Sequence, residues 1–321
     1  MCGSSLERRQ FLKSASLAAS ASWLGMTAGL ADHHEKKRKM TINLVCGAIG
    51  VRANQQQAID LAAKHGFESV EASASELADL NEDAMQALLG DLKAKDLSWG
   101  TSGLSVEFRR DEDTFQKGLK ALPKLAAGLQ RAGVDRVSTY LMPSHAELTY
   151  LQNMKGHATR LREVAKVLKD HGQRLGMEYV GTQGLLTRGK YPFLHTLAET
   201  QELIGEIGTG NVGVVLDTWH WWTAGDSAEA IRALKNEEVI LVDLNDAPKG
   251  VAKEDQQDNR RQLPLATGVI DVKSFLEALL AIGYDGPVRP EPFNQTLNDL
   301  DDDSACKASV EAMKKAFALI A

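Results

Sequence analysis

The feature that most constrains the fold of this chain is an alternation of short apolar runs with longer segments of helical periodicity. It starts at Thr41 and continues to the C-terminus through eight strand-helix units. Strict alternation of this kind is typical of parallel strands joined by crossover helices. We expect strands at residues 42–46, 69–71, 97–101, 136–141, 175–180, 211–217, 239–244 and 288–291.

The segments between these strands carry apolar residues three to four positions apart, as on one face of a helix. The expected helices are 55–65, 81–95, 113–132, 155–171, 193–207, 271–282 and 307–320. An open doubly wound sheet usually has fewer strands. The segment Gly47-Ala48-Ile49-Gly50 also lacks the spacing of a dinucleotide-binding glycine motif. The sequence therefore predicts an α/β fold, a closed (β/α)8 TIM barrel.

The first 40 residues do not belong to the predicted barrel. Arg8 and Arg9 precede an apolar pair and Lys13, and a stretch rich in small residues follows at 14–31. The length and the charged start are typical of an export signal, and the arginine pair resembles the twin-arginine signal. We expect a signal peptide at 1–31, a charged linker at 32–40 and one catalytic domain at 41–321. The prediction is a periplasmic or otherwise exported protein that meets the twin-arginine export machinery and has no stable membrane anchor.

The charge of the chain bears on its partners. With 43 acidic against 37 basic residues the formal net charge is −6, which disfavours a nucleic-acid groove. A small-molecule sugar remains a suitable partner, and the sequence leaves the oligomeric state open. Cys46 and Cys306 are the two cysteines outside the predicted signal, and without CxxC spacing we expect them to be separate.

Acidic residues end the last four predicted strands: Glu178, Asp217, Asp243 and Glu291. In a barrel of this kind the C-terminal ends of the strands meet at one mouth, where catalytic groups are found. Four carboxylates there repel one another unless a cation joins them. Oxygen ligands suit hard ions, so the sequence predicts a divalent metal, with Mn²⁺ or Mg²⁺ preferred.

Four segments carry a resemblance to a known family: residues 176–181 (GMEYVG), 216–222 (LDTWHWW), 244–248 (LNDAP) and 290–293 (PEPF). They resemble the sugar phosphate isomerase/epimerase family of xylose isomerase-like TIM barrels, over essentially all of residues 41–320. The resemblance implies metal ligands at Glu178, Asp217, position 243 and Glu291, with His220 beside the metal. The family usually has histidine at position 243. The aspartate found here either ligates a hard metal or marks a changed site.

The resemblance also implies an activity, that of a divalent-metal-dependent isomerase or epimerase of a sugar or keto-sugar. Glu178 and Glu291 would be the catalytic acid and base in α-proton abstraction through a metal-stabilised enediolate, and His220 would orient a substrate oxygen. Two alternatives stay open. One is a lyase or dehydratase acting on a keto-sugar, keto-inositol or keto-glycoside, and the other is a non-catalytic sugar-binding protein. Export favours an unphosphorylated substrate.

Four further residues are candidates for substrate binding. Glu71 ends the second strand, where a surface salt bridge is the alternative. His145 lies in the loop after the fourth strand, where a solvated loop histidine is the alternative. Trp219 follows Asp217 among three tryptophans, of which at least one could wall the pocket, while the alternative is packing between the barrel and the helices. Arg261 lies on the long loop after the seventh strand, where it either receives an anionic group or is solvated.

Overall fold

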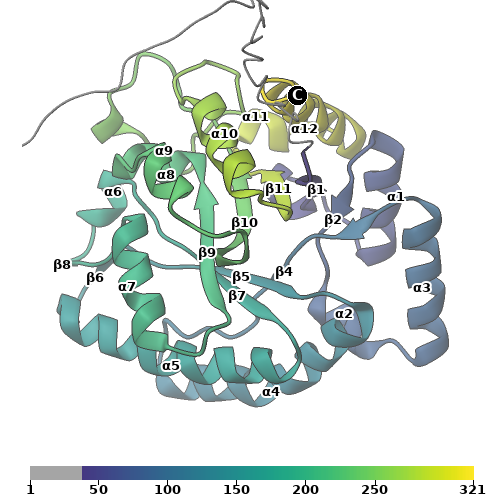
Figure 1. Cartoon of the computed structure of the whole chain (residues 1–321), viewed down its shortest axis with the longest axis horizontal. Coiled ribbons are helices and arrows are strands. Elements are labelled where there is room, and N and C mark those ends of the chain that lie inside the picture. The colour runs from purple at the N-terminus through teal and green to yellow at the C-terminus, as the bar shows by residue number, and fades with distance from the viewer. Residues whose placement is uncertain (1–37) are drawn as a thin grey trace, which may run out of the picture. The chain divides into compact units, whose positions relative to one another are not determined.

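The computed structural model describes residues 38–321 (Figure 1). The predicted signal peptide and residues 32–37 of the predicted linker lie outside the described residues. Within the described part, no helix has the length and apolar character needed to span a membrane. Cys46 and Cys306 are both free thiols.

The strands form one parallel sheet that curls around a central axis, with helices outside it (Figure 1). Neighbouring strands follow the order β3-β2-β1-β11-β10-β9-β7-β5-β4. Their bounds are β1 Thr41–Leu44, β2 Ser69–Val70, β3 Ser98–Trp99, β4 Ser102–Gly103, β5 Arg136–Tyr140, β7 Arg174–Glu178, β9 Val212–Asp217, β10 Val239–Leu244 and β11 Pro287–Pro290.

The two ends of this order, β3 and β4, are consecutive in the chain and close the barrel. On one side the Gly100 N–H donates to the Val70 carbonyl (2.9 Å), and on the other the Leu104 N–H donates to the Ser138 carbonyl (2.8 Å). A Cβ atom at Gly100 would collide with the buried side chain of Asn43 on β1, so glycine leaves the room that Asn43 occupies. Residues 98–103 therefore act as one interrupted strand, and the predicted eight-stranded (β/α)8 barrel is confirmed.

Seven longer helices flank the barrel: α1 Gln55–His65, α3 Glu82–Ala94, α4 Glu112–Ala132, α5 Tyr150–Asp170, α7 Leu197–Ile207, α10 Val272–Ile282 and α12 Asp302–Phe317. Two of them begin earlier than predicted because local caps set their starts. Thr149 and Gln152 form a capping box before α5, and the Asp301 carboxylate accepts the Ser304 N–H (2.9 Å) before α12. Apolar periodicity predicts later starts for both helices, because the first turn of each is polar and carries no such periodicity.

Several short elements were not predicted, because they are too short to show periodicity. Most lie in the loops that follow the strands. They are α2 Ala74–Asp79, α6 Gln183–Leu186, α8 Thr218–Ala224, α9 Ala228–Arg232, α11 Gln295–Asn298, the 3-10 turns η1 Cys46–Ile49, η2 Asn236–Glu238 and η3 Lys253–Asp255, and the antiparallel pair β6 Ser144–His145 and β8 Tyr191–Pro192.

Candidate metal centre

The four predicted acidic ligands meet at the C-terminal ends of adjacent strands. Glu178 and Asp217 end β7 and β9, Asp243 is the fifth residue of β10, and Glu291 follows β11 directly. One carboxylate oxygen from each of them lies within 4.8 Å of the others. The parallel register produces this convergence, since Asp243 is the partner of Asp217 across β10 and β9.

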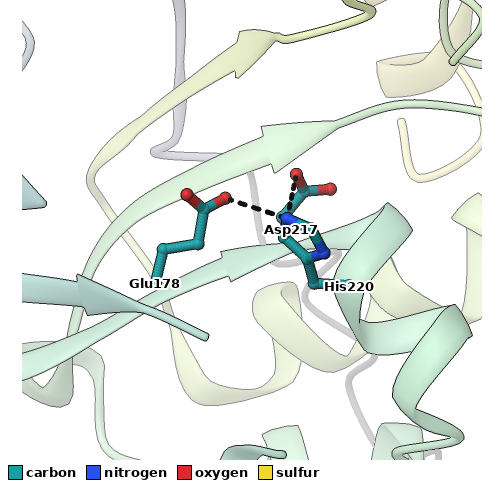
Figure 2. Close-up of side chains that lie close together, drawn as sticks. All are labelled: Glu178, Asp217 and His220. Atoms are coloured by element: carbon teal, nitrogen blue, oxygen red, sulfur yellow. Dashed lines mark ion pairs between the residues drawn. The ribbon is translucent and has the colours of Figure 1, made fainter. Parts of the chain in front are cut away.

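His220 reaches the same point from α8, the short helix that Asp217 caps. The Asp217 carboxylate accepts the Trp219 N–H (2.6 Å), which turns the chain so that His220 faces the cluster. Its Nε2 atom lies 3.9 Å from Glu178 Oε1 and 4.0 Å from Asp217 Oδ2 (Figure 2). Burial, and then the nearby Arg261 charge, lower the pKa of His220 to about 3, so its ring is neutral near pH 7.

Arg261 lies in the middle of the cluster and is 1% exposed, so the alternative of a solvated loop arginine does not hold. Its Nη1 atom donates to Asp217 Oδ2 (2.8 Å) and Glu291 Oε2 (3.0 Å). Its Nη2 atom donates to Asp258 Oδ1 (2.8 Å) and contacts His220 Nε2 (3.1 Å). The long loop between β10 and α10 thus folds back over the barrel mouth and inserts a positive charge among the carboxylates.

A second arginine, Arg289, was missed in the sequence. It donates from Nε and Nη2 to the two oxygens of Asp243 (2.6 and 3.0 Å), and from Nη2 to Glu291 Oε1 (2.8 Å). Arg289 and Asp243 are direct cross-strand partners of β11 and β10. The signal was available, because Arg289 precedes Glu291 by two positions and alternate residues of a strand share a face.

Two polar side chains directly after β10, those of Asn245 and Asp246, hold this arrangement in place. The Asn245 amide donates to Asp217 Oδ1 (2.9 Å), and its oxygen accepts the Glu291 N–H (3.1 Å). The Asp246 carboxylate accepts the N–H groups of the segment 267–270 and of Ala247, at 2.7–3.2 Å. Asp246 also pairs through its backbone with Gln262, the residue after Arg261. The loop that carries Arg261 is therefore fixed to the end of β10.

The electrostatics of the cluster leave a place for a cation. When all four carboxylates are ionised, the two guanidinium groups leave an excess of two negative charges. Burial raises the pKa of Glu178 well above its usual range, and its neighbour Glu291 raises it further. Burial likewise raises the pKa of Asp217 to about 6 and that of Asp243 to about 7. A group of carboxylates that resists ionisation in this way is one that a divalent ion would stabilise.

The hydrogen bonds indicate which oxygens are available to such an ion. Glu178 Oε1 is buried and has no hydrogen-bond partner among the described residues. Every carboxylate oxygen of Asp217, Asp243 and Glu291, by contrast, accepts at least one hydrogen bond. The residues present fit a divalent metal that uses the free Glu178 oxygen and shares Asp217 and Glu291 with Arg261. Both oxygens of Asp243 pair with one guanidinium group, that of Arg289, which makes Asp243 the least available of the four predicted ligands.

A cavity of about 560 Å³ opens in front of the cluster. Glu178, Glu291, His220, Arg261 and Arg289 line it, whereas Asp217 and Asp243 lie fully buried behind the two arginines. The walls combine apolar and polar groups, the usual composition of a small-molecule site. The remaining lining residues are Glu71, Gly103, Leu104, Arg109, Ser138, Thr139, Tyr140, Val180, Val215, Leu241, Asp258 and Phe293.

Of the four predicted substrate contacts, the structure places Glu71 and Arg261 in the cavity wall and the other two elsewhere. Trp219 is fully buried, and its indole N–H donates to Thr182 (3.1 Å) behind the site. His145 belongs to β6, and its Nδ1 atom accepts the N–H groups of Glu147 and Leu148 (3.0 and 2.8 Å). The predictions for Trp219 and His145 are thus corrected: one packs in the core and the other shapes a turn.

Other cavity residues were not predicted. Asp258 pairs with Arg261 three positions along the loop, and Tyr140 and Phe293 are exposed aromatic residues at the rim. Arg109 stacks on Tyr140, with its guanidinium carbon 3.9 Å from the ring centre. Strand-end position offered a signal for Tyr140, the last residue of β5. The loop residues carried none, since their approach depends on how each loop folds.

The chain is similar in sequence to one protein family and to several characterised enzymes. A family model described as xylose isomerase-like TIM barrel matches residues 59–316. The chain is 22% identical over 267 residues to an inosose isomerase of Bacillus velezensis, covering 81% of this chain and 90% of that one. It is 25% identical over 182 residues to a 3-dehydroshikimate dehydratase of Pseudomonas putida, but that match spans only 27% of the dehydratase.

Solved structures agree on the fold. A xylose isomerase domain protein from Alicyclobacillus acidocaldarius has a TM-score of 0.77 and 31% identity, covering 88% of this chain and 99% of that one. The IOLI protein, solved with a bound zinc atom, has a TM-score of 0.70 at 19% identity, covering 87% and 98%.

Proposed function

The chain belongs to the family of xylose isomerase-like TIM barrels, and from this premise we propose that it is a divalent-metal-dependent isomerase or epimerase of a sugar or keto-sugar. The observation that carries the proposal is the buried cluster of four carboxylates with an excess of two negative charges, facing a cavity of about 560 Å³. A purely structural ion-pair network would not need Glu178, whose Oε1 atom is buried and has no hydrogen-bond partner among the described residues.

In this proposal Glu178, Asp217 and Glu291 hold the ion, and Asp243 contributes least. A bound divalent ion supplies Lewis acidity toward the carbonyl and neighbouring hydroxyl oxygens of the substrate. Because carboxylate oxygens are the ligands that hard ions prefer, we propose that the ion is Mn²⁺ or Mg²⁺. The IOLI protein was solved with a bound zinc atom, which supports a divalent ion in this chain without deciding which one.

Glu178 and Glu291 reach the cavity from β7 and from the end of β11, so a sugar between them meets a carboxylate from each. We assign them the removal and return of the proton next to the carbonyl. Each oxygen of Glu291 accepts from one arginine, which fixes its orientation. Glu178 lacks such partners and is the freer of the two to move a proton. His220, held neutral by burial, can donate to or accept from a substrate oxygen.

A lyase is the second candidate, favoured by the similarity to a 3-dehydroshikimate dehydratase. It would begin with the same proton removal and differ in the bond that breaks next. An unsaturated product absorbs in the ultraviolet, whereas an isomerised or epimerised sugar does not, so the spectrum of the product separates the two reactions.

The decisive experiment measures solvent deuterium incorporation into a panel of ketoses and keto-glycosides, with metal content determined on the same protein. We expect exchange with the metal-loaded protein and its loss in Glu178→Gln, which keeps the size of the side chain but removes the base. Thr159→Gln, on the exposed face of α5, is the matched control. Absence of exchange with every sugar, despite a full complement of metal, would sink the proposal.

We also propose that the protein is exported by the twin-arginine route and acts on an unphosphorylated sugar. Arg8 and Arg9, outside the described residues, support the first point. A reporter fused to residues 1–40 tests the route by cell fractionation. We expect the double variant Arg8→Lys, Arg9→Lys to keep the reporter in the cytoplasm, and the control Arg38→Lys to leave its export unchanged. Export that survives the paired replacement would contradict this route.

A further inference from the structure

A second cavity, of about 590 Å³, adjoins the first. It lies where β1, β2 and β4 end and where α1 and α2 begin, at the same mouth of the barrel. The two cavities share two lining residues, Glu71 and Gly103. Because they meet at these residues, the space in front of the carboxylate cluster continues toward the early strands.

The junction between the cavities is free of an obstructing side chain on one side. Gly103 ends β4, and a Cβ atom placed there would meet nothing within 4 Å. Glu71 stands on the other side, directly after β2, and burial raises its pKa. A chain of atoms leaving the first cavity can therefore pass over Gly103 and beside a carboxyl group.

The second cavity offers free polar groups and no aromatic ring. Arg52, Ser102 and Ser105 line it, and their side chains make no hydrogen bond or ion pair with any other described residue. Gln55 is held rigidly, because its amide donates to the Glu71 carbonyl (3.0 Å) and accepts the Ser73 N–H (2.6 Å). Leu44, Val51, Val70 and Leu125 also line the cavity, so it presents apolar surface beside hydrogen-bonding groups, as the faces and the hydroxyl groups of a sugar ring require.

The two adjoining cavities together can hold a larger substrate than either cavity alone. Pockets for small ligands measure roughly 300–1,000 Å³, and either cavity alone falls in that range. A single sugar held by Glu178 and Glu291 would leave the whole second cavity to water. We propose that the second cavity binds a second sugar unit, so that the substrate is a disaccharide-sized glycoside whose reacting ring lies at the carboxylate cluster. This inference rests on the proposed function for the identity of the reacting ring.

The test compares fructose with lactulose, turanose and palatinose, ketoses that carry a second sugar unit, by calorimetric binding to the Mn²⁺-loaded protein. We expect at least one disaccharide to bind about tenfold more tightly than fructose, as about 1.4 kcal/mol of added contacts would give. Ser105→Trp and Ser75→Trp, both at exposed positions on the second cavity, should reduce that ratio to about one. Thr159→Trp, on the outer face of α5, is the control and should leave the ratio unchanged.

Binding of every disaccharide no tighter than fructose, or an equal loss for both sugar classes in the tryptophan variants, overturns the second sugar site. Circular dichroism of each variant confirms that the barrel is intact. Solvent deuterium incorporation, measured in parallel, separates the two proposals. Deuterium incorporation without tighter binding of any disaccharide would support the proposed function and contradict the second sugar site. Tighter binding of a disaccharide without deuterium incorporation would support the second sugar site and contradict the proposed function.

Discussion

At the residue scale, the site consists of carboxylates whose charge is only partly balanced by two arginines. Arg261 joins Asp217, Asp258 and Glu291, and Arg289 joins Asp243 to Glu291. The aspartate at position 243 is therefore understood together with its cross-strand partner. Aspartate stands at this position, where the family resemblance led us to expect histidine, and a guanidinium group is available to pair with it.

The first prediction concerns that pair. Arg289→Met should lower the free energy of unfolding by about 3–5 kcal/mol, because it leaves the fully buried Asp243 without its partner. Adding Asp243→Leu should recover most of the loss, since two apolar side chains of similar size can replace a buried ion pair. Urea unfolding of the metal-free proteins measures both. A double variant no more stable than Arg289→Met would show that the two side chains are not coupled.

A second prediction concerns His157, which packs on Phe108 and Phe193 away from the metal centre. Burial lowers its pKa from 6.5 to about 4. The native state thus binds fewer protons than the unfolded state between these values. Stability is fully present above pH 6.5 and falls as the pH drops toward 4, by up to about 3 kcal/mol.

His157→Met should remove this contribution. Urea unfolding at pH 7 and at pH 4.5 gives the comparison, and the fall in stability between them should be smaller in the variant by about 2 kcal/mol or more. His171→Met, at a partly exposed position after α5, is the control. If the stability of all three proteins depends equally on pH, then the pKa of His157 is the same in the folded and the unfolded state, which contradicts the prediction.

At the element scale, the strands deliver the carboxylates and the loops complete the site. β7, β9, β10 and β11 end at one level, which places Glu178, Asp217, Asp243 and Glu291 together. The loop after β10 then brings Arg261 back across the mouth, and Asp246 ties it to the strand through backbone contacts. The position of Arg261 at the metal centre therefore depends on the contacts that Asp246 makes with its loop at the end of β10.

The third prediction belongs to this loop. Asp246→Ala should destabilise the protein by about 2–4 kcal/mol, because several backbone N–H groups of residues 267–270 lose their acceptor. It should also weaken metal or sugar binding by displacing Arg261. Asp271→Ala, which removes only the cap of α10, should cost about 1 kcal/mol and leave binding intact. Equal effects of the two changes on binding would contradict the role given to Asp246.

At the scale of the whole molecule, a closed barrel concentrates charge at one mouth, and the metal should therefore govern global stability. We predict that Mn²⁺ raises the melting temperature and that chelation reverses the rise. When the Mn²⁺ concentration is about 100 times the dissociation constant, binding should raise the free energy of unfolding by about 2.7 kcal/mol. Differential scanning calorimetry measures it, and Glu178→Gln should reduce it sharply whereas Thr159→Gln should not. An unchanged melting temperature with saturating Mn²⁺ would rule out a site of useful affinity at this mouth.

Much of this could be predicted from the sequence, because barrel strands and long helices have a local signature. Apolar runs located all eight strands, and the helix predicted at 81–95 corresponds to α3, Glu82–Ala94. Short helices such as α2 and α8 were missed, because a single turn or two carries no periodicity.

The sequence by itself determined the closed barrel and the four acidic strand ends, since strand position and side-chain alternation are local properties. Only the tertiary structure decided what surrounds those acids. Arg289 had to be placed opposite Asp243 by the register of β11 and β10, and Arg261 had to return from a loop whose path no local pattern records. Trp219 and His145 were misplaced for the same reason: whether a polar or aromatic side chain near a strand end faces the cavity or the core depends on the packing of its loop.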